Sequence, residues 1–269
     1  MAEDKIIHHS EGPRTRTSLA TDFRHLGLRE GMTVIVHSSM SSLGWVCGGA
    51  LTVIQALQDV ITANGTIIMP THSTNLSDPK EWENPPIPRS WWQTVRNEMP
   101  AFDPALTPTF FMGKISELFR TFPSVKRSNH PKYSFAAWGK HQTEIISNHS
   151  LENGLGKDSP LGKIYQLGGY VLLLGTGYNS NTSMHLGEHH SGMINTVTTA
   201  SPVVENGQKR WKDYQELKYD EEIFPKIGEV FETQNEIRIG NVGSAEAKLI
   251  FQPAIVDFTA AYICEHMSE

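Results

Sequence analysis

The stretch YVLLLG at 170–175 constrains the fold more than any other part of this 269-residue chain. A strand that is apolar at every position has no face to leave in water, which is typical of a strand inside a parallel sheet covered by helices on both sides. Other strand-like runs alternate with helix-like patterns along the chain. We expect strands at 33–36, 64–70 and 133–139, and helices at 50–61, 114–122 and 159–169. The alternation predicts an α/β sandwich with a largely parallel or mixed central sheet.

The length of the chain favours one large domain, and we expect a single domain over residues 1–269. Two stretches interrupt the alternation. Residues 72–112 are rich in Pro and Trp and too long for a routine connection, so we expect an ordered functional insertion. Residues 205–236 are dense in acidic side chains, and we expect a surface excursion there. Closing helices are expected at 240–250 and 254–266.

Composition excludes several classes of protein. Lys plus Arg total 23 and Asp plus Glu total 29, a net charge of −6 that argues against a nucleic-acid-binding surface and is compatible with a cationic ligand. Cys47 and Cys264 lie far apart and form neither a disulfide framework nor a zinc motif. The polar N-terminus lacks a signal core, and the apolar runs are too short to span a bilayer. We expect a cytoplasmic protein without a membrane partner; oligomeric state carries no signal.

Residues 34–50, VIVHSSMSSLGWVCGGA, predict a strand, a loop of small residues and the start of a helix. This order suits phosphate binding, because glycines let the backbone approach an anion and helix amides point at it. The sequence lacks both GxxxxGK[ST] and GxGxxG, so neither an ATPase nor a dinucleotide fingerprint is indicated. Additional hydroxyl donors would be Ser38, Ser39, Ser41 and Ser42. An ordinary turn without a ligand remains the alternative, with Cys47 as a buried structural thiol.

Residues 181–190, NTSMHLGEHH, allow three interpretations. His185, Glu188 and His189 match the HxxEH pattern of a metallopeptidase group, although Gly187 weakens the helix and no third ligand is evident. Without a metal, Glu188 can accept a hydrogen bond from His185 one helical turn away, which leaves the other ring nitrogen free to take a proton. The third interpretation is a polar surface loop. The position after a buried strand favours a functional site.

A cluster of acids lies within the 205–236 segment: Asp213, Glu216, Asp220, Glu221 and Glu222. Such a cluster would attract a polycationic ligand. Lysines are interleaved with these acids, so a solvated charged face is an equally simple interpretation.

Several long motifs occur in the order typical of one family: VIVHSSMSSLGWVCGGA, GTIIMPTHS, DPALTPTFFMGKISELFRTFPSVKRSNHPKYSFAAWG, DSPLGKIYQLGGYVLLLGTGYNSNTSMHLGEH and GNVGSAEAKLI. The chain resembles the aminoglycoside 3-N-acetyltransferases over roughly residues 15–265. The resemblance implies the α/β fold of that family, which differs from the GNAT acetyltransferases. It also implies direct transfer of acetyl from acetyl-CoA to the 3-amino group of an aminoglycoside, a reaction of antibiotic resistance, without a metal.

The resemblance also implies roles for individual residues. His185 would be the general base and Glu188 its partner. Residues expected to bind coenzyme A are His37, Ser38, Ser39, Met40, Ser42, Leu43, Gly44, Thr71, Thr107, Thr109 and Arg127, the last of these at the phosphates. Residues expected to face the cationic substrate are Asp213, Asp220, Glu221 and Glu222. The alternatives are acetylation of another amine metabolite, a metal-dependent hydrolase using His185, Glu188 and His189, and a CoA-binding protein without activity.

Overall fold

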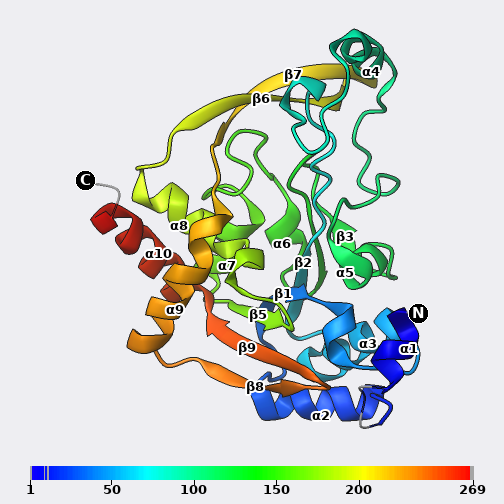
Figure 1. Cartoon of the computed structure of the whole chain (residues 1–269), viewed down its shortest axis with the longest axis vertical. Helices are drawn as coiled ribbons and strands as arrows, with labels where there is room; N and C mark the ends of the chain where they lie inside the picture. The colour runs from blue at the N-terminus through cyan, green and yellow to red at the C-terminus, as the bar shows by residue number, and fades with distance from the viewer. Residues whose placement is uncertain (1, 9, 11, 267–269) are drawn as a thin grey trace.

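A computed structural model describes residues 2–8, 10 and 12–266, in which a seven-stranded mixed sheet lies between two layers of helices (Figure 1). The strand order is β3-β4-β2-β1-β5-β9-β8. The strands are β1 (Thr33–Ser38), β2 (Thr66–Pro70), β3 (Lys126–Arg127), β4 (Phe135–Gly139), β5 (Tyr170–Leu174), β8 (Arg238–Val242) and β9 (Ala245–Phe251). β1 pairs in parallel with β2 and with β5, and the remaining pairs are antiparallel. The expected α/β sandwich with a mixed sheet is confirmed.

The interior strand β5 is buried on both faces, as its apolar sequence predicts. Leu172 and Leu174 belong to the core on one side of the sheet, whereas Val171 and Leu173 belong to the core on the other side. All four side chains are fully buried. The twofold alternation of a strand therefore joins both helical layers to one sheet.

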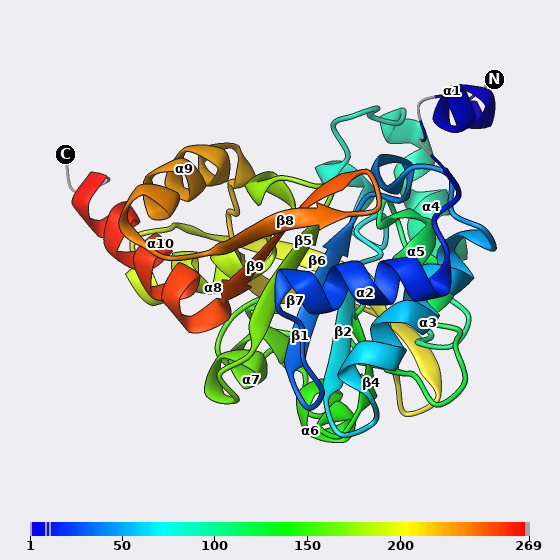
Figure 2. The same ribbon diagram turned by 90° about the horizontal axis from the view of Figure 1, so that it is seen from below.

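Helices cover each face of the sheet. On one face lie α2 (Arg16–Leu26), α3 (Gly49–Ile61) and α5 (Gly113–Phe119), two of which cross the near side of the sheet in Figure 2. On the other face lie α6 (Gln142–Ile146), α7 (Pro160–Gln166), α8 (Ser183–Ser191), α9 (Phe224–Gln234) and α10 (Gln252–His266). The short α1 (Ala2–His8) lies at the N-terminus. In the described ranges no helix is both long and apolar enough to cross a membrane.

The helix expected at 240–250 is wrong, because this segment forms the antiparallel pair β8–β9. Gly243 has a φ of 59° and lies in the tight turn between Val242 and Ala245. In β9, Ala245, Ala247, Leu249 and Ile250 are buried, and the strand pairs along the whole of β5. Pairing with a central strand thus outweighs the helix propensity of Ala, Glu and Lys. The helix expected at 254–266 is confirmed as part of α10.

The acidic segment 205–236 is more than a surface excursion. It begins at the turn of a hairpin formed by β6 (Thr196–Glu205) and β7 (Gln208–Leu217), which arches over the top of Figure 1. Asn206 and Gly207 both have positive φ, at 52° and 74°, as a two-residue hairpin turn requires. The segment continues through η5 (Glu221–Ile223) into α9, whose Phe224 and Phe231 are core residues. The segment therefore contributes to the core.

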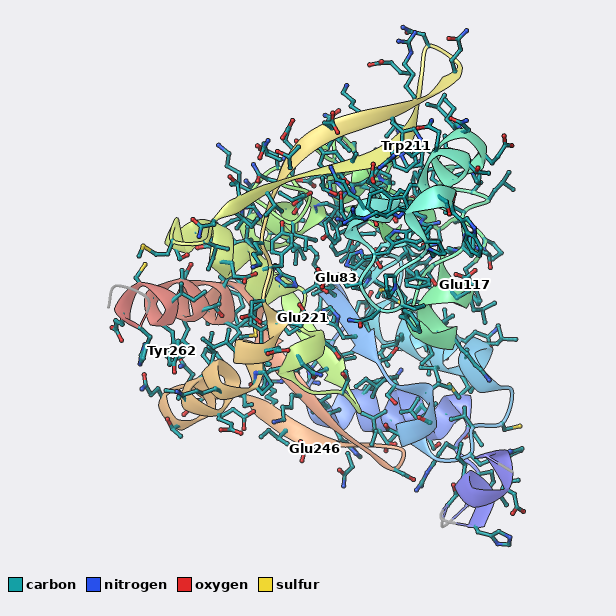
Figure 3. All side chains as sticks on the ribbon, turned by 45° about the horizontal axis from the view of Figure 1, so that its top comes forward. Glu83, Glu117, Trp211, Glu221, Glu246 and Tyr262 are labelled. Atoms are coloured by element: carbon teal, nitrogen blue, oxygen red, sulfur yellow. The ribbon has the colours of Figure 1, made fainter. Side chains whose placement is uncertain are left out.

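The Pro- and Trp-rich segment 72–112 packs beside the hairpin (Figure 1). Its short helices are η2 (Pro79–Glu81), η3 (Arg89–Trp91) and α4 (Trp92–Glu98). Trp211 of the hairpin, labelled in Figure 3, donates its indole N–H to the Arg96 carbonyl oxygen at 2.7 Å. The two ends of the segment meet, because the Phe110 N–H donates to the His72 carbonyl oxygen at 2.8 Å. The insertion thus begins and ends at the same point beside the sheet.

Candidate active site

The parallel strands β2, β1 and β5 end at one edge of the sheet, where a cavity of about 430 Å³ lies. Its wall includes His37 and Ser38 from the end of β1 and Thr176 just after β5. A groove of about 760 Å³ adjoins it. The cavity and the groove share five wall residues: Ser38, Phe111, Met112, Thr176 and Ser180. A site at the carboxyl ends of parallel strands is the usual position in an α/β protein.

His185 and Glu188 of α8 form a close pair in this wall. The His185 Nδ1 lies 2.5 Å from Glu188 Oε2, and the other carboxylate oxygen accepts the Asp220 N–H at 3.1 Å. Glu188 is only 1% exposed, whereas the His185 ring lines the cavity. Because a carboxylate accepts, Nδ1 carries the hydrogen and Nε2 is left unprotonated in the neutral ring. The i,i+3 hydrogen bond expected from the sequence is present.

Gly187 explains how α8 holds this pair. A Cβ atom at this position would lie 2.6 Å from the Thr259 Cβ and 2.7 Å from the Val256 carbonyl oxygen, both on α10. Glycine therefore lets the two helices pack in direct contact, at a cost in helix propensity that packing outweighs. This contact places the polar side of α8 towards the cavity.

Two further histidines, His37 and His72, line the same cavity and are buried. Loss of solvation, followed for His37 by the nearby charge of His185, lowers the pKa of each imidazole from 6.5 to about 3. Both rings are therefore neutral at physiological pH. The sequence interpretation included His37 but missed His72, whose only local signal is its place just after β2.

Tyr219 connects the cavity to a buried acid. Its ring centroid lies 4.6 Å from that of His185, and its hydroxyl donates to Glu216 Oε2 at 2.8 Å. Burial raises the pKa of Glu216, which is 1% exposed, to about 7. His189 Nε2 lies 2.8 Å from the same hydroxyl, and because that hydroxyl donates to Glu216, the imidazole donates to it. Glu216 and Tyr219 are thus functional candidates that the sequence did not single out by role.

The HxxEH pattern would make His189 a metal ligand, but its Nε2 atom is hydrogen-bonded to the Tyr219 hydroxyl instead. In the part of the chain that the structure describes, no three side chains among His, Cys, Asp and Glu are grouped to hold a metal ion.

The groove is built mainly from the loop after β1, which contains η1 (Met40–Leu43). Ser38, Ser39, Met40 and Gly44 line it, as do Ser41 and the exposed Lys114. Three residues predicted in this loop lie outside the groove: His37 lines the cavity, Ser42 donates to the Ser39 hydroxyl at 2.8 Å, and Leu43 is part of the core. Cys47 is exposed, so its expected burial is wrong.

Arg127 lies behind the cavity wall, and its guanidinium donates hydrogen bonds to other groups of the protein. It donates to the carbonyl oxygens of Thr71 and Thr107 at 2.5 Å each, and its charge lies over the Phe102 ring. The N–H of Thr109 donates to a Glu117 carboxylate at 2.8 Å. The four predicted residues Thr71, Thr107, Thr109 and Arg127 therefore tie the insertion to the sheet and line neither the cavity nor the groove.

The predicted acidic residues separate in the structure. Glu221, labelled near the middle of Figure 3, lines the cavity. Asp220 provides the N–H that binds Glu188, and its side chain accepts the Glu222 N–H at 3.0 Å. Asp213 is exposed on β7 and lies outside the cavity wall. One acid of the four is therefore placed to face a ligand in the cavity.

A histidine held by a buried glutamate at the carboxyl ends of parallel strands is typical of an α/β enzyme that transfers protons. Residues 35–264 match the family described as aminoglycoside 3-N-acetyltransferase, and the chain belongs to this family of acyltransferases. It is 49% identical over 266 residues to the SPbeta prophage-derived aminoglycoside N(3')-acetyltransferase-like protein YokD of Bacillus subtilis, covering 98% of each chain. It is 32% identical to aminoglycoside N(3)-acetyltransferase IX of Micromonospora chalcea, again over 98% of each.

Solved structures agree with this assignment. The crystal structure of YokD superposes with a TM-score of 0.98 over 99% of each chain. AAC-IIIb, solved as a binary complex with CoASH, superposes at 0.82 with 28% identity, over 94% of this chain and 97% of that one. AAC-VIa bound to sisomicin gives 0.84 at 25% identity, over 94% and 98%. The expected family fold is thereby confirmed.

Proposed function

We propose that the protein transfers the acetyl group of acetyl-CoA to the 3-amino group of an aminoglycoside, with His185 as the general base. The observation that carries the proposal is the 2.5 Å bond between His185 and Glu188 in a cavity that adjoins a second groove. Membership of the family supports it, as do the relatives solved with CoASH and with sisomicin.

The groove would hold coenzyme A and the cavity the aminoglycoside. The groove contains serine hydroxyls, a glycine with positive φ at Gly44 and the ammonium of Lys114, which suit phosphates. The wall that both spaces share, with Ser38 and Phe111, is where the thioester would meet the amine. Such an arrangement turns a reaction between two molecules into one within a complex.

The chemistry follows from the protonation states. An amine that is protonated at neutral pH cannot attack a thioester, so the unprotonated His185 Nε2 removes a proton. The amine nitrogen then bonds to the thioester carbon and loses a second proton as the carbon–sulfur bond breaks. The leaving thiolate takes up one proton, and His185 gives up the proton it holds, so that the neutral imidazole is restored. General-base catalysis of this kind contributes about 10²–10⁴-fold. The Ser38 and Ser39 groups in the groove wall would stabilise the developing oxyanion.

Charge favours a cationic acceptor. Glu221 lies in the cavity wall, and the chain carries a net charge of −6. We assign Glu221 to direct contact with the acceptor and place Asp220 and Glu222 at the rim of the cavity. Asp213 would act only through the long-range electrostatic field of the protein. The reaction would take place in the cytoplasm, where acetyl-CoA is available, and would protect a host from the antibiotic.

A thiol-release assay with acetyl-CoA tests the proposal against a panel of aminoglycosides and simple amines. We expect release with aminoglycosides, nearly complete loss in His185→Ala and retention in His190→Ala, an exposed histidine of the same helix. Coenzyme A should bind the His185→Ala variant with unchanged affinity. Release with simple amines alone would replace the aminoglycoside by another amine metabolite, and unchanged turnover by His185→Ala would remove the base assignment.

A further inference from the structure

His72 presents one nitrogen to the protein and leaves the other without a partner. It lies two residues after the end of β2 and is 7% exposed in the cavity wall. Its Nδ1 lies 3.1 Å from the Ser134 carbonyl oxygen. A carbonyl oxygen only accepts, so the ring hydrogen is on Nδ1.

The second nitrogen of His72 is therefore a lone-pair acceptor. Burial lowers the pKa of this imidazole to about 3, so the neutral ring holds a single N–H and Nε2 carries none. That Nε2 atom is buried and has no hydrogen-bond partner among the residues that the structure describes. A buried acceptor without a hydrogen bond destabilises the fold, so such an atom needs a physical reason.

The cavity supplies the explanation. His37, His72 and His185 all line this one cavity. His37 Nε2 is also buried without a partner in the described chain. Tyr133 and Phe135 hold the His72 ring by edge contacts, with ring centroids 5.5 and 5.1 Å away. The ring is thus fixed beside the proposed base before any ligand binds.

We propose that His72 is a substrate-binding residue whose Nε2 accepts a hydrogen bond from an N–H of the amine that is acetylated. The inference rests on the proposed function and adds a second imidazole, that of His72, to the groups that contact the amine. After His185 removes one proton, a primary amine keeps two N–H bonds and a lone pair. A hydrogen bond to His72 fixes one of those N–H bonds, so that the lone pair can be aimed at the thioester. His185 is the proton acceptor and His72 the orienting acceptor.

Two substitutions separate this role from a structural one. In His72→Asn, the side-chain amide can replace Nδ1 and donate to Ser134, but no atom occupies the Nε2 position. In His72→Gln, the longer amide reaches that position and can accept. We expect kcat/KM for the aminoglycoside to fall about 10–100-fold in His72→Asn, as for loss of a hydrogen bond to a charged or reacting group. His72→Gln should recover part of this loss, with melting temperatures and coenzyme A affinity unchanged in both variants.

The pH profile gives a second readout. Because Nε2 of His72 does not titrate near neutrality, the acidic limb of the kcat/KM profile should keep its midpoint in His72→Asn while its height falls. The groups that influence His72 are His37 on β1, His185 on α8 and His149, and all three remain in the variant. Loss of that limb would make His72 the base and overturn the inference. Wild-type kcat/KM in His72→Asn, or equal losses in both variants with lowered melting temperatures, would also overturn it.

Different results would contradict the proposed function and the role of His72. If the wild-type protein acetylates no amine, the proposed function fails and the inference falls with it. If the wild-type protein is active and His72→Asn is equally active, only the inference fails.

Discussion

The cavity and the groove adjoin each other but are built in opposite ways. The cavity brings together side chains from five distant segments: His37 and His72, which are buried, and Tyr133, His185 and Tyr219, which are half-buried. The groove comes mainly from the continuous loop 38–46 and from 111–114, where Phe111 is 88% exposed. A buried, hydrogen-bonded wall suits a step that depends on orientation, whereas an open loop suits binding. Changes in the cavity should therefore lower kcat, and changes in the groove should raise KM for acetyl-CoA.

The strongest test of this difference is Glu188→Gln. The glutamine oxygen can still accept the Asp220 N–H, but its amide would donate to His185 Nδ1. That exchange moves the ring hydrogen to Nε2, so the ring can no longer take a proton from the amine. We expect kcat to fall at least about 100-fold with little change in KM for acetyl-CoA, measured by steady-state thiol release. A change confined to KM would contradict the division between the two regions.

Glu216→Gln tests the buried acid that Tyr219 connects to the cavity. Since burial raises the pKa of Glu216 from 4.5 to about 7, the folded state binds the proton more tightly than the unfolded state. The wild-type protein therefore loses stability through this group as pH rises from 4.5 to 7, by about 3 kcal/mol. Glutamine does not titrate, so the variant does not lose this stability. The free energy of unfolding of Glu216→Gln should therefore rise relative to that of wild type between pH 4.5 and 7.

Denaturant titrations at pH 4.5, 6 and 8 measure this effect. Glu229→Gln, at an exposed position on α9, is the matched control and should show a constant difference from wild type. A constant difference for Glu216→Gln as well would mean that its carboxyl titrates normally.

Lys114→Ala tests the groove. The ammonium is exposed and makes no ion pair with another described residue, so it is available to a phosphate. We expect KM for acetyl-CoA to rise roughly threefold to tenfold at low salt, less at high salt, with kcat retained. Lys140→Ala is the control, because Lys140 follows β4 at the sheet edge where β2 begins, opposite the site. A loss of kcat in Lys114→Ala would contradict a role limited to binding.

The smallest effect is expected at Phe111, which lines both spaces and has a φ of 56°. A bulky side chain is strained in this left-handed region, by about 1–3 kcal/mol. Phe111→Gly and Phe111→Ala both remove the ring, but only glycine relieves the backbone. The glycine variant should be more stable than the alanine variant by about 1 kcal/mol in denaturant unfolding. An alanine variant of equal stability would show that the loop relaxes.

The difference between a cavity built from distant segments and a groove built from one continuous loop also explains which site residues the sequence can predict. The His185–Glu188 bond and the 38–44 loop each lie in one short stretch, so local spacing was sufficient to find them. His72 and Tyr219 join the site only through long-range packing, which spacing cannot show. Arg127 matched a family motif, yet its guanidinium donates to carbonyl oxygens of the insertion and of the residue before it. A buried guanidinium requires many such acceptors.

Two features of the acidic segment predict its structure from sequence alone. Asn206-Gly207 between β-rich runs predicts a hairpin. On the strand that follows, Tyr214 and Glu216 face inward while Asp213 faces water, since side chains alternate. Strand parity would therefore have favoured Glu216 over Asp213. The β8–β9 pair, by contrast, depends on contact with β5 and carries a helix-like composition.

A crystal structure with coenzyme A and an aminoglycoside tests the central claim most directly. The account predicts the sulfur at the wall that Ser38 and Phe111 share between the two spaces, with the 3-amino nitrogen about 3 Å from His185 Nε2. A sulfur atom held elsewhere on the molecule, with no amine near the His185 ring, would contradict it.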